Sequence, residues 1–504
     1  MKKNIYFLLA FLTCSLGCSD TGQGVDERLS EEIRIQESGP IRQHPENPHY
    51  FLYRGKPLIL ITSGEHYGAL LNLDFDYKKY LKTLSADGMN YTRIFTGTYF
   101  ELPAESFNIK HNTLAPEKGS RITPWALVIE DLSGNLKYDL SSWNDAYFKR
   151  LKELMNLAAS YDIIVEVTLF TSIYRDEHWE VSPQNPKNNV NIDHEINRLD
   201  AQTLNNGTLL RYQEGLVRKM VQELNGFDNF FFEIQNEPWA DHPVPVLNIE
   251  NKEDLVPGDW RLKADFADES SLAWQRKIAS IIIDEESKLG RKHLIAQNFT
   301  NFKAPIPEVD SNVSIMNFHY NWPETVEWNY GYNKVIAFDE SGFAGSGDKV
   351  YRRQAWRFIL SGGGLFNNLD YSFFTGYEDG TLVNEAPGGG SATLRKQLKI
   401  LSDFIHGFNV IALKPDYSSV LHAPGIISYV LSDPGREYAI FLHSVTGNST
   451  ITMKIPSGNY TIQQMNTVNG EMLKEERLQA GEGPVKLKVN LPERELALKI
   501  IKVK

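Results

Sequence analysis

Two glutamates, each at the end of an apolar run, are the residues of this chain best suited to chemistry. Glu237 follows the run 230–235 in Asn236-Glu237-Pro238, and Glu340 ends the run 334–340 in Phe-Asp-Glu. A pair of carboxyl groups can divide acid–base work, because one protonates a leaving oxygen while the other attacks carbon or activates water. Glycosidic bonds are cleaved by this chemistry, and it requires that the fold bring both carboxyls to one site.

The element that carries Glu237 is predicted to be a buried strand. The run 230–235 is short and aromatic, and Pro238 cannot donate a hydrogen bond to a sheet ladder. Similar runs predict strands at 57–62, 89–95, 163–170, 293–298, 313–320, 334–340 and 363–370. Amphipathic stretches predict helices at 76–87, 142–161, 209–224, 270–289 and 351–360. Eight strands interleaved with helices predict an α/β fold, a (β/α)8 TIM barrel over residues 39–408, in which Glu237 and Glu340 share one rim.

The remainder of the chain, residues 409–504, has a different pattern. Short alternating stretches occur at 426–431, 437–442, 449–453, 459–463, 485–489 and 496–500, with turn-forming residues between them. This pattern predicts a C-terminal antiparallel β-sandwich domain. Two roles are open for it, either burial of apolar surface against the barrel or glycan binding.

The first 38 residues are predicted to lie outside the fold. Residues 1–18 combine Lys2-Lys3, an apolar stretch and Ser15-Leu-Gly-Cys18, which is typical of a bacterial lipoprotein signal peptide with Cys18 as the acylated residue. A plain secretory signal cut near Cys18 is the alternative. Residues 19–38 are polar and acidic and suit a tether. We therefore expect a lipid-anchored protein of the bacterial cell envelope, which contacts the membrane only through that anchor.

Composition limits the classes of molecule that the protein is expected to bind. The net charge of −12 argues against nucleic acid or an anionic membrane surface as a partner. Both cysteines lie in the signal segment, so no disulfide or cysteine metal site is expected in the mature protein. The histidines are scattered without a His-Glu-x-x-His motif, and glycine runs lack a following Gly-Lys-Ser/Thr, so neither metal nor cofactor is expected. A carbohydrate is the expected partner, and the oligomeric state is open.

Asn-Glu-Pro after the fourth strand and Glu after the seventh resemble the clan A glycoside hydrolases, in particular the cellulase-like family 5 group. The resemblance covers about residues 45–405. It implies that Glu237 is the general acid/base, that Glu340 is the nucleophile, and that the configuration of the sugar is retained. It also implies that Asn236 contacts the 2-hydroxyl of the sugar at the cleavage point.

The same resemblance extends to the second and sixth strands. Arg93 in Tyr-Thr-Arg-Ile-Phe matches an arginine that keeps the nucleophile ionised, and His319-Tyr320 matches a pair whose tyrosine orients it. Two positions depart from the family. Leu-Phe-Thr at 169–171 stands where many relatives have histidine, and residues 367–371 stand where many have a tryptophan beneath the sugar.

Further substrate contacts are expected from position on the rim. They are Glu65, His66 and Tyr67 after the first strand, and Trp239, Trp322 and Trp328 on later loops. Structural roles are open for several residues: a helix-terminal carboxylate for Glu237, a turn for Glu340, a core histidine for His319, and a partner of Arg93 for Glu233. By strand alternation Glu233 faces the barrel interior and needs a cation.

Together these features predict a retaining glycoside hydrolase that acts on a β-linked oligo- or polysaccharide by double displacement. The alternatives are a non-catalytic glycan-binding lipoprotein on the same barrel, and a transglycosylase with the same residues. Fold alone distinguishes none of these.

Overall fold

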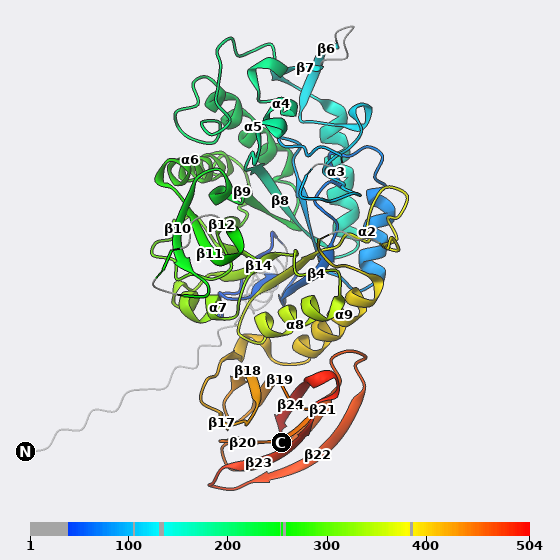
Figure 1. Cartoon of the computed structure of the whole chain (residues 1–504), viewed down its shortest axis with the longest axis vertical. Helices are drawn as coiled ribbons and strands as arrows, with labels where there is room; N and C mark the ends of the chain where they lie inside the picture. The colour runs from blue at the N-terminus through cyan, green and yellow to red at the C-terminus, as the bar shows by residue number, and fades with distance from the viewer. Residues whose placement is uncertain are drawn as a thin grey trace, which may run out of the picture.

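The computed structural model describes residues 39–103, 106–130, 136–251, 254–255, 259–383 and 387–503. The predicted signal peptide with Cys18 and the tether lie outside these residues. At the centre, eight parallel strands form one sheet in the order β4-β15-β14-β13-β12-β9-β8-β5 (Figure 1). Their bounds are β4 (Leu60–Gly64), β5 (Tyr91–Phe95), β8 (Ile164–Thr171), β9 (Phe230–Asn236), β12 (Ile295–Asn301), β13 (Ile315–His319), β14 (Val335–Ser341) and β15 (Leu365–Leu369).

The predicted barrel is confirmed, and a side chain helps to close it. Strands β4 and β5 are the two ends of the sheet order. The Asn90 side chain accepts a hydrogen bond from the Ile61 backbone N–H at 2.8 Å and donates one to the Ile59 carbonyl at 2.9 Å. The side-chain amide therefore takes the place of a backbone partner for the N–H of Ile61 and the carbonyl of Ile59, next to the start of β5.

The strands are shifted along the chain relative to prediction, most clearly at the first one. Residues 57 and 58, expected in that strand, belong to β3 (Lys56–Leu58), which forms an antiparallel sheet with β1 (Arg42–Gln43) and β2 (Phe51–Tyr53). Phe51 stacks on Phe231 of β9, in an apolar cluster with residues near the start of each barrel strand. One continuous apolar run therefore serves two elements, and periodicity alone does not divide it.

Helices surround the barrel (Figure 1). Those described are α2 (Tyr77–Ala86), α3 (Asp145–Ser160), α4 (Asp176–Val181), α5 (Leu209–Leu224), α6 (Glu269–Glu286), α7 (Glu324–Asn329), α8 (Asp348–Ile359) and α9 (Ala392–His406). Helix α3 begins after Asn144, whose side chain accepts from two backbone N–H groups, and not at Ser142 as predicted. Helix α9, absent from the prediction, is capped by Ser391 and buries Leu394, Leu398 and Leu401.

Two hairpins extend from connections on the rim. The first is β6 (Trp125–Glu130) with β7 (Leu136–Trp143), and the second is β10 (Pro243–Asn248) with β11 (Lys263–Ala267). Short 3₁₀ turns occur at η1 (Lys118–Ser120), η2 (Pro186–Asn188), η3 (Pro238–Ala240), η4 (Trp260–Leu262), η5 (Tyr330–Tyr332), η6 (Val410–Ala412) and η7 (Pro492–Arg494). No helix among the described residues is long and apolar enough to cross a membrane.

The C-terminal region consists of two antiparallel sheets, as predicted. One has the order β16-β18-β19-β24-β21-β22 and the other β17-β20-β23. Their bounds are β16 (Lys414–Pro415), β17 (Val420–His422), β18 (Ile426–Asp433), β19 (Glu437–Ser444), β20 (Asn448–Met453), β21 (Gly458–Met465), β22 (Met472–Ala480), β23 (Val485–Asn490) and β24 (Glu495–Lys502). Figure 1 shows these sheets below α8 and α9.

The sandwich packs directly on the barrel helices. Trp356 of α8 stacks on Phe441 of β19 with ring centroids 5.5 Å apart. Glu495 is fully buried and pairs with Arg352 at 2.6 Å and with Arg353 at 2.9 Å. Apolar burial and a buried ion pair therefore join the two parts, which agrees with the packing role considered from the sequence.

Candidate active site

The backbone turns sharply where the barrel strands end. Five non-glycine residues with left-handed φ follow β4, β9, β12, β13 and β14: Tyr67 (58°), Glu237 (47°), Phe302 (59°), Tyr320 (51°) and Phe343 (56°). This conformation is costly for side chains with a Cβ and occurs mainly where the surrounding structure imposes it. The strained positions gather at one end of the barrel, and four of these five residues line its cavity.

That cavity has a volume of about 570 Å³ and contains the predicted carboxyl pair. Its described lining is His66, Tyr67, Phe95, Tyr99, Glu101, Phe107, Asn108, Leu114, Thr171, Tyr174, Arg175, Asn236, Glu237, Trp239, Ala240, Pro243, Trp260, Lys263, Asp265, Asn301, Tyr320, Glu340, Phe343 and Pro387. Aromatic walls with a few polar groups are typical of small-molecule sites.

Glu237 is held by both its backbone and its carboxylate. Its N–H donates to Asn298 Oδ1 at 3.0 Å, and its carbonyl accepts from Ser172 Oγ at 2.7 Å. The carboxylate accepts from the Tyr174 hydroxyl at 2.8 Å and lies 2.8 Å from His319 Nδ1. Four contacts on one strained residue fix the direction of its carboxyl group.

Glu340 occupies the opposite side of the cavity. Its oxygens accept from the Tyr320 hydroxyl at 2.7 Å and from Arg93 Nη1 at 3.2 Å. Burial raises the pKa of Glu340, and the charge of Glu237 adds to this. The charges of His319 and Arg93 and the Tyr320 hydrogen bond oppose the rise, but the net pKa remains above its usual value.

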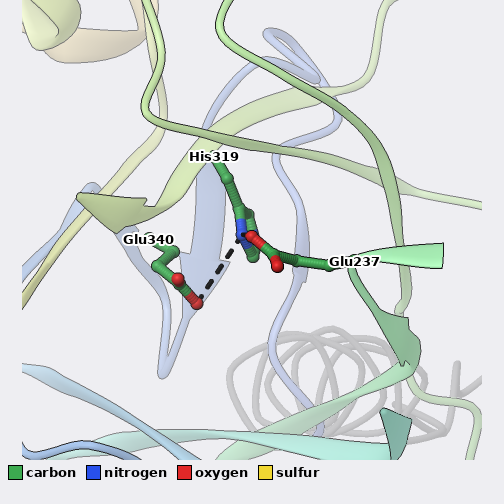
Figure 2. Close-up of side chains that lie close together, drawn as sticks. All are labelled: Glu237, His319 and Glu340. Carbon is green, nitrogen blue, oxygen red and sulfur yellow. Dashed lines mark hydrogen bonds and ion pairs between the residues drawn. The ribbon is translucent and has the colours of Figure 1, made fainter. Parts of the chain in front are cut away.

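His319 lies between the two glutamates (Figure 2). Its Nδ1 is 2.8 Å from Glu237 and 3.6 Å from Glu340, and its Nε2 is 3.3 Å from Asp339. Burial lowers the pKa of His319, but the charges of Glu340 and Asp339 and its hydrogen bonds outweigh burial and raise the net pKa well above its usual value. Both ring nitrogens then carry protons, and the imidazolium donates to Glu237 and Asp339.

Arg93 is the buried cation beneath the pair. It contacts Glu233 at 2.6 Å, Asn236 Oδ1 at 2.8 Å and Asp339 at 3.6 Å, in addition to Glu340. The expected partnership of Arg93 and Glu233 is therefore present, together with its proximity to Glu340. Because Asn236 accepts from Arg93, its amide nitrogen faces Tyr174 and donates to the hydroxyl at 2.8 Å.

The structure separates the other predicted contacts into two groups. His66, Tyr67 and Trp239 line the cavity. Glu65 does not line it, since its carboxylate caps the backbone N–H groups of Gly68 and Ala69 at 3.0 and 3.1 Å. Trp322 is also outside the described lining, and the Lys303 ammonium lies 4.2 Å from its ring centroid. Their positions therefore do not support the predicted substrate contacts of Glu65 and Trp322.

Several residues that form or support the site were not found from the sequence. Tyr174, Asp339 and Trp260 are the most consequential, because each contacts Glu237, His319 or the tyrosine that binds Glu340. Tyr174 and Trp260 lie in long connections without hydrophobic periodicity. Only their aromatic residue type could have indicated a role at the site. At the departures from the family pattern, Thr171 lines the cavity, while the Asn367 amide donates to the Asp339 carbonyl at 3.0 Å.

Two groups of side chains could offer ligand atoms to a metal. Within each group the atoms lie no more than 4.8 Å apart: Glu237, His319 and Glu340 in one, and Glu166, Glu233 and Asp339 in the other. Arg93 contacts Glu340 in the first and Glu233 and Asp339 in the second. The guanidinium therefore already supplies positive charge at these carboxylates.

Glu101 is another carboxyl of the cavity lining whose pKa burial raises, and this has a testable consequence for stability. Burial raises its pKa from 4.5 to about 7, against hydrogen bonds from Asn112 and Tyr99. The folded protein keeps this proton up to about pH 7, whereas the unfolded chain releases it near its ordinary value. Stability is therefore fully present below pH 4.5 and falls as pH rises towards 7. Glu101→Gln should remove a change of the order of 2 kcal/mol.

The measurement is urea unfolding of wild type and Glu101→Gln at pH 5 and pH 8. The pKa of Glu65 is also raised to about 7, mainly by burial, and contributes the same trend to both proteins. The difference between them therefore isolates Glu101. Equal dependence on pH in the two proteins would contradict the shifted pKa.

Comparison with known proteins identifies the fold. The sequence matches no protein-family profile and no curated protein. A glycoside hydrolase family 5 structure from Bacteroides vulgatus is similar with a TM-score of 0.59 and 10% identity, over 93% of this chain and 94% of that one. A second Bacteroides vulgatus structure, with a provisional glycoside hydrolase assignment, has a TM-score of 0.62 and 11% identity, over 92% and 82%. A further structure named only as a glycoside hydrolase has a TM-score of 0.56 and 11% identity, over 92% and 97%. At these identities the comparisons establish a shared fold.

Proposed function

We propose that this protein is a retaining glycoside hydrolase that cleaves β-glycosidic bonds in an oligo- or polysaccharide. One observation carries the proposal: a carboxylate oxygen of Glu237 and one of Glu340 lie within 4.8 Å of each other in the cavity. Retaining enzymes place their carboxyl groups about 5–5.5 Å apart, whereas inverting enzymes leave about 6.5–9.5 Å for a water molecule. Nearest oxygens no more than 4.8 Å apart are compatible with the retaining spacing, in which one glutamate attacks the sugar directly.

In the first step Glu340 attacks the anomeric carbon while the bond to the leaving oxygen breaks. Glu237 gives its proton to that oxygen, so the leaving group departs as an alcohol. The roles are supported by the surroundings, because Arg93 and Tyr320 donate to Glu340 and stabilise its carboxylate. Glu237 lies 2.8 Å from His319 Nδ1 and accepts from the Tyr174 hydroxyl, and these contacts fix the direction of the carboxyl group that delivers the proton.

In the second step Glu237 removes a proton from water, and the water oxygen attacks the anomeric carbon. The bond from that carbon to Glu340 breaks, which restores the carboxylate and releases a sugar with its original configuration. Asn236 is proposed to bind the 2-hydroxyl, since its amide is fixed by Arg93 and Tyr174 at the edge of the cavity.

We also propose that the enzyme is lipid-anchored through Cys18 in a bacterial cell envelope. The support is the order of charged, apolar and small residues before Cys18, which lies outside the described residues. Metabolic labelling with a palmitate analogue, compared between wild type and Cys18→Ala, tests this separately from catalysis. Equal labelling of both proteins would contradict it.

The enzymatic proposal is tested on a panel of β-glucans, mannans, galactans and xylans, with products resolved by length. Hydrolysis of at least one polymer is expected, and it should be absent in the double variant Glu237→Gln/Glu340→Gln. Binding without turnover across the panel would favour the glycan-binding alternative. Products longer than the substrate, formed when an acceptor sugar is added, would favour transglycosylation.

A further inference from the structure

The β10–β11 hairpin contributes a group of side chains to the cavity that catalysis does not use. Trp260, Lys263 and Asp265 all line the cavity. Asn301, at the end of β12, lines it beside them and accepts from the Asp265 backbone N–H at 2.9 Å. A segment inserted after β9 is thereby fixed to the barrel and forms part of the cavity wall.

Trp260 is held in place but remains accessible. It stacks on Phe302 with centroids 5.6 Å apart and planes at 20°, which covers one face of its ring. Its other ring contacts are edge-on, with Tyr320 at 5.3 Å and Phe343 at 6.2 Å. Trp260 nevertheless remains 41% exposed, so part of its ring surface is available to a ligand. Tyr320, which Trp260 contacts, donates to Glu340, so a single side chain links the indole to that catalytic glutamate.

Lys263 and Asp265 form a largely buried ion pair on the same hairpin. The Lys263 ammonium lies 2.9 Å from both oxygens of Asp265, and their side chains are 13% and 6% exposed. An ammonium has three donors and a carboxylate has about four acceptor sites, so this contact leaves capacity on both. A donor next to an acceptor matches two neighbouring sugar hydroxyls, each of which both donates and accepts.

The charge of the cavity favours a neutral sugar. Four carboxyl groups line its described part, from Glu101, Glu237, Asp265 and Glu340, against the two cations Arg175 and Lys263. Burial lowers the pKa of His66 to about 3, so this lining residue adds no positive charge near neutral pH. Glu101 stays protonated up to about pH 7 and Glu237 is protonated as the acid, so Asp265 and Glu340 balance the two cations. The described lining therefore has no surplus positive charge to attract the carboxylate of a uronic acid.

We propose that Trp260, Lys263 and Asp265 form a sugar subsite next to the cleavage point, which takes one neutral ring of a β-linked chain. The C–H face of the ring stacks on Trp260, and two adjacent hydroxyls bind Lys263 and Asp265. This inference rests on the proposed function and adds the substrate class. Trp260, in the loop after the fourth barrel strand, thus offers the sugar an aromatic platform. The eighth strand, where many relatives have a tryptophan, carries Asn367 instead, and its side chain bonds to Gly64 and Asp339.

Trp322 provides a matched control for Trp260. It is 42% exposed, it lies on a neighbouring rim loop, and it is outside the described lining of the cavity. Truncation of either tryptophan removes a similar half-exposed indole, but only Trp260 is expected to affect sugar binding.

The test is calorimetric titration of the inactivated protein, Glu340→Gln, with the β-linked tetrasaccharides of glucose, mannose, xylose and galactose. In this background Trp260→Ala should weaken the tightest of these by about ten-fold, because the sugar loses its apolar contact. Asp265→Asn should weaken it by about five-fold. Trp260→Phe, which keeps an aromatic face, and Trp322→Ala should each remain within about two-fold to three-fold.

Thermal unfolding of each variant checks that it is folded. If Trp260→Ala does not fold, Trp260→Phe is used in its place. In that case Trp260→Phe together with Asp265→Asn should bind about five-fold more weakly than Trp260→Phe alone. Unchanged binding in Trp260→Ala, equal weakening in Trp322→Ala, or no binding of any tetrasaccharide to the parent would overturn the subsite. Dependence of binding on Trp260 without hydrolysis by the wild type would leave the subsite standing and refute the enzymatic proposal.

Discussion

Replacement of Glu340 by alanine is expected to lower kcat on the preferred β-linked substrate by roughly a thousand-fold or more. Glu237 cannot take its place, because it is needed as the acid and is fixed by Tyr174 and His319. Azide should enter the space left by the side chain and restore turnover on an activated aryl glycoside, with an α-glycosyl azide as product. Steady-state kinetics with and without azide measure both effects.

Glu101→Ala is the matched control for this prediction. Glu101 is a buried carboxyl lining the same cavity, but it contacts Tyr99 and Asn112 and neither catalytic glutamate. We expect its removal to change kcat by less than about ten-fold, with no response to azide. A loss of only a few-fold in Glu340→Ala, or no restoration by azide, would refute Glu340 as the nucleophile.

The second large effect is expected from Arg93→Met, which should reduce both stability and activity. Arg93 is fully buried and contacts Glu233, Asp339 and Glu340. Without it, buried carboxylates lose their cation, and breaking such a pair costs about 3–5 kcal/mol. The pKa of Glu340 should also rise further, because Arg93 is one of the charges that lower it, and the protonated form is a poor nucleophile.

Urea unfolding and kcat/KM per folded molecule separate the two losses. Arg395→Met is the control, since Arg395 is buried and pairs with Asp87 and Asp370, each at 2.6 Å, outside the described lining of the cavity. It should lose comparable stability but keep its activity once folded. Full activity in folded Arg93→Met would contradict a role for Arg93 in holding Glu340 ionised.

Much of the barrel and its central charges could be predicted from sequence, because strand patterns are strongly periodic. Alternation along 230–236 places Glu233 inside the barrel, and the Arg93 partner follows from the need to neutralise it. Asp339 illustrates where this reasoning fails. It precedes Glu340 directly, so alternation predicts that the two point to opposite faces, yet both contact Arg93. A register shift between Phe338 and Ser341 adds one residue and turns both inward.

The cavity wall was less predictable because it is formed by long connections. Trp260 and Tyr174 acquire their roles only when loops fold over the barrel end, and no local period marks them. Glu65 shows the opposite error, since a carboxylate after a strand was expected to bind substrate but caps a turn instead. The retaining mechanism and the lipid anchor remain predictions.

If Glu237 and Glu340 cleave by double displacement, the first product keeps the β configuration of the substrate, so its stereochemistry distinguishes this mechanism from inversion. Proton NMR of the preferred oligosaccharide, recorded within the first minutes of hydrolysis, separates the anomeric signals before mutarotation mixes them. The new reducing end should appear first as the β-anomer. Initial appearance of the α-anomer would contradict it, because a water molecule would then have attacked the anomeric carbon directly.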